Sequence, residues 1–251
     1  MARRSLFSSG NPFLKEETYR NTANTPLDAS FITAGERMTV QGAVNKSFIL
    51  FGLMLMTAVA SFMYPSMLFM AVGAIGGFIA VLVASFKPHT SATAAPIYAL
   101  LEGLFVGSIT AIYGGIANGI VFNAITLTMG ILFAMLFIYK TGIIKVTDKL
   151  RMGVVMATVA VALVYLVNLI LHFFGISVPY LHQAGPIGIG ISVVIIGIAA
   201  FNLLLDFDNF ERGERFGAPI YMEWFSAMGL LITLVWLYIE VLRLLAILNR
   251  R

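Results

Sequence analysis

Seven long runs of apolar residues divide this chain of 251 residues. A helix that crosses the hydrocarbon core of a bilayer needs about 20 mostly apolar residues. Transmembrane strands would instead be about 10 residues long with alternating polarity, a pattern that these runs lack. We therefore expect an all-α, polytopic membrane protein built as a bundle of seven transmembrane helices. The predicted spans are residues 47–64, 66–86, 94–113, 116–139, 152–174, 186–205 and 224–248.

The composition excludes several classes of protein. The chain is 59% hydrophobic and 11% charged, whereas soluble domains are about 25% charged. This excludes soluble enzymes, disordered chains and nucleic-acid binders, so we expect the lipid bilayer as a partner and no nucleic acid. There is no cysteine, which removes disulfides and cysteine-ligated metal centres. No HExxH or GxSxG string occurs, so we expect no enzymatic activity and no cofactor.

The first 46 residues are polar and contain no apolar run. They predict a flexible N-terminal tail rather than a secretory signal, followed by a membrane domain over residues 47–251. Most of the 16 lysines and arginines lie in this tail and in the loops after the second, fourth and sixth spans. Because such residues collect on the cytoplasmic side, we expect a cytoplasmic N-terminus and, after seven spans, a C-terminus outside.

A few ionisable residues lie inside or at the ends of the spans, where they are costly and often functional. Glu102 lies in the third span, Asp206 and Asp208 lie at the end of the sixth, and Glu240 and Arg243 lie in the seventh. Glu240 and Arg243 are three residues apart, so they share a helix face and can pair. Two further alternatives stay open: Asp206 can be the first solvated residue after its helix, and Glu102 can bond to another helix or hold a proton.

Two strings in the last spans resemble a known family. They are Leu205–Asp208 and Leu237–Glu240, with a lead-in from Met38 to Lys46. The chain resembles the Bax inhibitor or YccA-like family, also called the transmembrane Bax-inhibitor-motif family, in its bacterial branch. The resemblance implies a seven-helix bundle with the last helix central and a pH-sensitive Ca²⁺ leak. It also implies that Asp206 and Glu240 share a proton and sense pH.

The chain departs from the pattern of that family at these same positions. Glu240 replaces the usual aspartate, and 34 residues separate it from Asp206. If the seventh helix begins at Trp224, Glu240 lies about 24 Å along it and cannot reach a residue at the start of that helix. The pair therefore needs a longer sixth helix, or Glu102 in place of Asp206. We expect a carboxylate cluster of Asp206, Glu240 and Glu102, with Asp208 nearby and Arg243 as counter-ion.

Two functions follow from the resemblance. The first is a leak channel or transporter for a cation, Ca²⁺ or H⁺, gated by the carboxylate cluster, with Asp206 and Glu240 as possible Ca²⁺ ligands. The alternative is a non-transporting membrane regulator that acts through a membrane protease or another membrane partner. The bacterial lead-in favours the bacterial inner membrane as the location.

Overall fold

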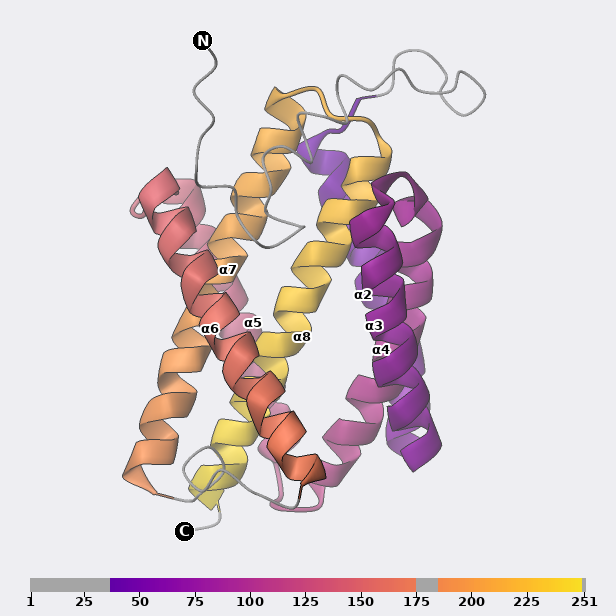
Figure 1. Ribbon diagram of the computed structural model, residues 1–251, viewed down its shortest axis with the longest axis vertical. Helices are drawn as coiled ribbons and strands as arrows, with labels where there is room; N and C mark the ends of the chain where they lie inside the picture. The colour runs from indigo at the N-terminus through magenta and orange to yellow at the C-terminus, as the bar shows by residue number, and fades with distance from the viewer. Residues whose placement is uncertain (1–36, 175–184, 250–251) are drawn as a thin grey trace. The chain divides into compact units, whose positions relative to one another are not determined.

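The computed structural model describes residues 37–174 and 185–249, and within them seven helices are long and apolar enough to cross a membrane. The predicted tail up to residue 36 lies outside this range. No β-strand occurs among the described residues, so the predicted all-α polytopic class is confirmed. The helices in Figure 1 are α2 (Val40–Met63), α3 (Met67–Phe86), α4 (Ser91–Gly114), α5 (Ile120–Thr141), α6 (Asp148–Phe173), α7 (Pro186–Arg215) and α8 (Tyr221–Asn249), with a short 3-10 turn, η2 (Pro88–Thr90), before α4.

The first membrane helix begins seven residues earlier than the apolar run predicts. Thr39 has extended backbone angles and caps α2, its hydroxyl oxygen accepting a hydrogen bond from Gly42 N at 2.9 Å. Such a cap satisfies one of the backbone N–H groups left free at a helix start. Residues 40–46, assigned to the tail from their polarity, therefore belong to α2, which corrects the predicted boundary between tail and membrane domain.

The sixth membrane helix is longer than predicted. α7 continues to Arg215 instead of ending at residue 205. Phe207 and Phe210 are buried on this extension, and Asp208 is paired one turn later with Arg212. Because the apolar side chains are buried and a charge is neutralised locally, the polar composition does not end the helix. The chain turns at Gly217, whose φ of +65° is readily adopted only by glycine.

The chain forms two compact units. Among the described residues, the first contains residues 37–109 and 205–232, and the second contains residues 110–174, 185–204 and 233–249. Helices α4, α7 and α8 contribute residues to both units.

The last helix is the most buried of the seven. In its most apolar stretch, 67% of the residues of α8 are buried, compared with 11% for α6. A helix with apolar side chains all round is expected to lie inside a bundle. The burial agrees with the predicted inner position of the last helix.

Glycines bring α2, α3 and α4 into backbone contact within the first unit. A Cβ atom at Gly103 or Gly107 of α4 would overlap backbone atoms of α2, and one at Gly73 of α3 would lie 2.6 Å from the carbonyl oxygen of Leu101. Ser61 of α2 donates its hydroxyl to Gly103 O at 3.2 Å. Membrane helices commonly pack closely at small residues in this way.

Hydrogen bonds between side chains join the helices of the second unit. Asn202 of α7 donates to Thr158 of α6 at 2.7 Å, and Thr110 and Tyr238 share a hydrogen bond of 3.0 Å between α4 and α8. In a bilayer, polar side chains that find partners on neighbouring helices contribute to helix association. These bonds therefore hold α6 to α7 and the end of α4 to α8.

The substitution Gly103→Ala should destabilise the protein, because the added methyl group overlaps the backbone of α2. We expect a loss of about 1–3 kcal/mol, measured as a lower midpoint of thermal unfolding in detergent. The matched control is Gly52→Ala on α2, where a Cβ meets nothing within 4 Å. Equal midpoints for the two variants would contradict the packing described.

Candidate functional site

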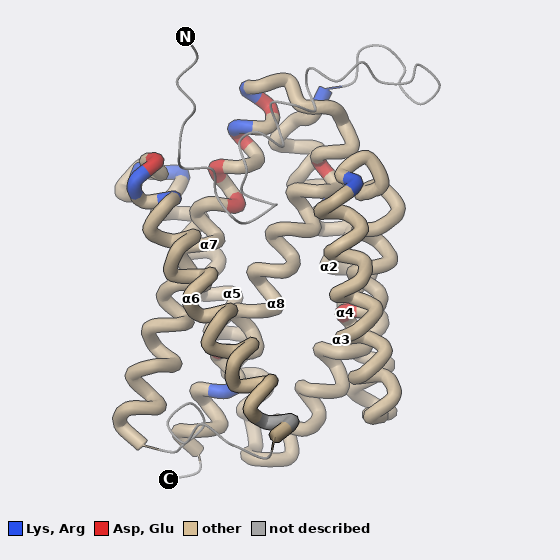
Figure 2. Tube along the Cα trace, in the orientation of Figure 1, with Lys and Arg blue, Asp and Glu red and all other residues tan. Residues whose placement is uncertain are grey.

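Few charged residues lie within the membrane helices, away from their ends. The buried charged residues that do lie there define the candidate site. In Figure 2, helices α3, α5 and α6 are almost uninterrupted runs of uncharged residues between their ends. By contrast, α7 carries Asp206 and Asp208, and α8 carries Glu240 and Arg243. These four side chains belong to residues that are only 3–9% exposed. Buried ionisable groups in membrane helices usually mark functional positions.

In the second unit, Glu240 and Arg243 form an ion pair on one face of α8, as their spacing predicts. Tyr165 of α6 joins this pair: its hydroxyl donates to Glu240 Oε1 at 2.6 Å and accepts a hydrogen bond from Arg243 Nη1. The guanidinium carbon lies 5.3 Å from the centroid of the tyrosine ring, a cation–π distance. Trp236 also donates to Glu240 Oε1, at 3.3 Å. The charge of Glu240 is thus compensated within its own unit.

This cluster limits what Glu240 can do chemically. A buried ion pair is held by the attraction of its members, and removal of one member leaves an uncompensated charge. While the pair holds, Glu240 has little capacity left to bind a cation. The Nε of the guanidinium has no hydrogen-bond partner among the described residues.

In the first unit, two buried aspartates lie on the part of α7 beyond residue 205, where the predicted sixth span ends. Asp206 is 8% exposed and Asp208 is 7% exposed. Asp208 Oδ2 accepts a hydrogen bond from Arg212 Nε at 2.7 Å, one turn along the helix. The expectation that Asp206 can be the first solvated residue after its helix is corrected, because the helix continues for nine more residues.

The sequence analysis expected Asp206 to pair with Glu240, or Glu102 to replace Asp206 in that pair. Asp206 and Glu102 belong to the first unit and Glu240 belongs to the second. Both pairings, which join residues of different units, stay predictions. The longer α7 does meet one condition that the pairing required.

Glu102 lies in the middle of α4 and is half-buried. It forms no hydrogen bond or ion pair with another described residue. Its carboxylate lies against Gly77 of α3, where a Cβ would come within 3.0 Å of Glu102 Oε2. The glycine therefore leaves room for the carboxylate in the contact between α3 and α4.

Within residues 37–174 and 185–249, no group of three or more His, Asp or Glu side chains is placed to hold a metal ion. Ca²⁺ takes 6–8 oxygen ligands. The expectation that Asp206 and Glu240 are possible Ca²⁺ ligands stays a prediction.

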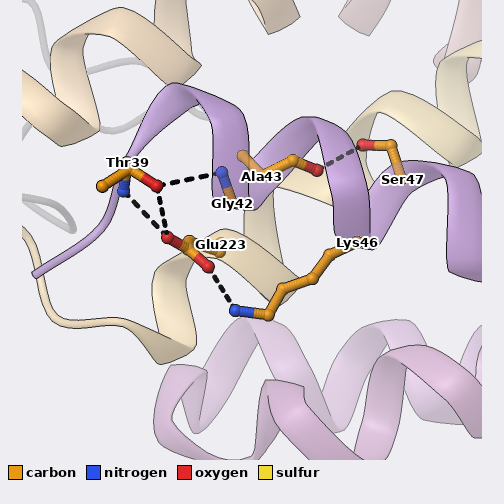
Figure 3. A network of polar contacts seen from close by, with 6 residues as sticks. All are labelled: Thr39, Gly42, Ala43, Lys46, Ser47 and Glu223. Atoms are coloured by element: carbon orange, nitrogen blue, oxygen red, sulfur yellow. Dashed lines mark hydrogen bonds and ion pairs between the residues drawn. The ribbon is translucent and has the colours of Figure 1, made fainter. Parts of the chain in front are cut away.

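Sequence reasoning missed a second network, drawn in Figure 3. Glu223, near the start of α8, accepts hydrogen bonds from Thr39 N at 2.8 Å and Thr39 Oγ1 at 3.1 Å, and pairs with Lys46. It also missed Tyr165. A signal existed for Tyr165, since a tyrosine in mid-span needs a partner for its hydroxyl. Nothing along the chain links Lys46 to Glu223, because only folding brings the two together.

The ion pair of α8 can be tested by a double-mutant cycle. We expect Glu240→Gln to lower the free energy of unfolding by about 3–5 kcal/mol, because it leaves Arg243 buried without its carboxylate. Combining it with Arg243→Met should cost less than the sum of the single changes. Glu102→Gln, which breaks no ion pair among described residues, is the matched control. Strict additivity in the cycle would show that the two side chains do not interact.

Comparison with known protein families covers almost the whole chain. A family model described as Bax inhibitor 1 like matches residues 11–250. No curated protein and no solved structure matches the chain significantly. The match agrees with the resemblance noted in the last two spans and with the bundle of membrane helices. The chain belongs to the Bax inhibitor 1 like family.

Proposed function

We propose that this protein is a pH-sensitive leak pathway for a cation, with Ca²⁺ as the transported ion. The observation that carries the proposal is the burial of ionisable side chains on α7 and α8 inside apolar helices. Such groups mark ion pathways and proton relays in membrane proteins. Membership of the Bax inhibitor 1 like family supports the same function through the leak that the resemblance implies. Carboxylate oxygens are also the ligands that Ca²⁺ prefers.

In this proposal Asp206 and Glu240 sense pH. Two carboxylates that approach each other retain one proton between them, because they cannot both ionise easily. Loss of that proton restores repulsion, and Glu240 then has Arg243 and Tyr165 as alternative partners. The exchange of partners would shift the equilibrium between closed and open states. Arg243 acts as the counter-ion that makes the ionised state tolerable inside the membrane.

One observation favours the alternative, a regulator that acts through a membrane protease or another partner. Met38 N donates to Ala218 O at 2.7 Å, in the turn between α7 and α8. A partner that binds residues 1–36 would therefore act on the chain next to the start of α8. For either function we propose the bacterial inner membrane, with the N-terminus in the cytoplasm and the C-terminus outside.

The leak is tested by Ca²⁺ flux into liposomes that carry the purified protein. We expect flux to differ severalfold between about pH 6 and about pH 8, because in this proposal the proton that two carboxylates share is lost as the pH rises. Asp206→Asn should remove most of this difference, since an amide does not titrate. Glu211→Gln is the control: it lies on the same helix, is exposed and removes the same charge.

Two results would contradict the leak. Flux no greater than in empty liposomes, from protein shown to be folded and inserted, would exclude Ca²⁺ as the transported ion. A pH response retained in Asp206→Asn would exclude Asp206 as the sensor. Deletion of residues 1–36 separates the two functions, because a leak should survive it and a regulator that works through that segment should not.

A further inference from the structure

A buried carboxylate ties the start of α2 to the start of α8 within the first unit. Glu223 is 4% exposed. Its Oε1 accepts two hydrogen bonds from Thr39, and its Oε2 pairs with the Lys46 ammonium (Figure 3). Thr39 is the N-cap of α2, and Lys46 lies two turns further along the same helix. One carboxylate therefore holds both the cap and the second turn of α2.

The surroundings of Glu223 fit a cation closely. The Lys46 ammonium lies 5.4 Å from the centroid of the Trp224 ring, within the range of a cation–π contact. Gly42 leaves space for the carboxylate, because a Cβ there would overlap all three atoms of the Glu223 head group. Carboxylate and ring together form a cation site at the start of α8, and the occupant of that site is a lysine of the same chain.

A second set of contacts lies beside this site. Met38 N donates to Ala218 O at 2.7 Å, Val40 N donates to Glu214 Oε1 at 3.1 Å, and Arg37 forms an antiparallel bridge with Pro219. Residues 37–40 therefore lie along the turn between α7 and α8.

We infer that Lys46 closes a charge latch, formed by residues 37–46 on one side and Glu214–Trp224 on the other, that couples the segment before α2 to α8. This goes beyond the proposed function and holds whether or not the protein conducts ions. Thr39 and Lys46 share the carboxylate of Glu223, so loss of the lysine charge also weakens the hydrogen bonds between Thr39 and Glu223. An uncompensated buried carboxylate then draws in water, which competes for the hydrogen bonds of Thr39.

The latch is tested by amide hydrogen exchange on the full chain in lipid nanodiscs. In Lys46→Gln we expect exchange to be faster by about tenfold or more in the peptides covering residues 37–46 and 214–224, because local opening sets the exchange rate of protected amides. Lys46→Arg, which keeps the charge, should retain most of the protection. Lys87→Gln is the matched control, because Lys87 is exposed and its side chain pairs with no described residue.

Rates are read against the peptide covering α3, so that a general loss of structure is not mistaken for opening of the latch. If Lys46→Gln does not fold, Glu223→Gln takes its place, since its amide oxygen still accepts from Thr39 while the charge is lost. Exchange in Lys46→Gln equal to that in Lys87→Gln would overturn the latch. Faster exchange confined to residues 37–46, with residues 214–224 unchanged, would overturn the coupling to α8.

Discussion

A bilayer cannot solvate a charge, so each ionised group on a membrane helix needs a partner inside the protein. On α8 this requirement is met twice by residues of the same unit. Glu223 is compensated by Lys46, and Glu240 is compensated by Arg243. Glu223 also accepts hydrogen bonds from Thr39, the N-cap of α2, and Glu240 also accepts one from Tyr165 of α6. The buried charges of α8 therefore contact neighbouring helices in each unit.

The two pairs differ in a way that matters for function. Glu240 and Arg243 lie on one helix, so they stay close whatever neighbouring helices do. Glu223 and Lys46 lie on different helices, so their contact depends on tertiary structure. Both members of the Glu240–Arg243 pair also contact Tyr165 of α6. The contact between Glu223 and Lys46 is lost when the starts of α2 and α8 separate, as the proposed latch requires.

Backbone contact at glycines distinguishes α2, α3 and α4 from α7 and α8, which carry the buried ion pairs. Gly73, Gly103 and Gly107 leave no room for a side chain. Tight packing of this kind resists small adjustments, since each would lose contacts or create overlap. Glu102 also lies on α4, and its carboxylate lies beside Gly77 of α3. This ionisable group is therefore located in the contact between two closely packed helices.

Much of this protein could be predicted from the sequence, because the physics of the bilayer acts on local composition. Long apolar runs predicted seven helices, and three-residue spacing predicted the contact between Glu240 and Arg243. The N-cap at Thr39 and the continuation of α7 past Asp206 were missed, since polarity alone suggested that both segments lie outside the helices. That expectation was wrong for two reasons. Thr39 caps α2 ahead of its polar first turns. On α7, Phe207 and Phe210 are buried and Asp208 pairs with Arg212, so the helix continues.

The sequence by itself therefore determined the class of protein, the number of membrane helices and some of the residues that carry buried charge, among them Glu240 and Arg243 but not Glu223. Tertiary structure decided which of those charges meet. Lys46 and Glu223 are 177 residues apart, and Tyr165 and Glu240 are 75 apart. No periodicity encodes such contacts, because they arise only when helices pack and each buried charge finds the partner that packing brings within reach.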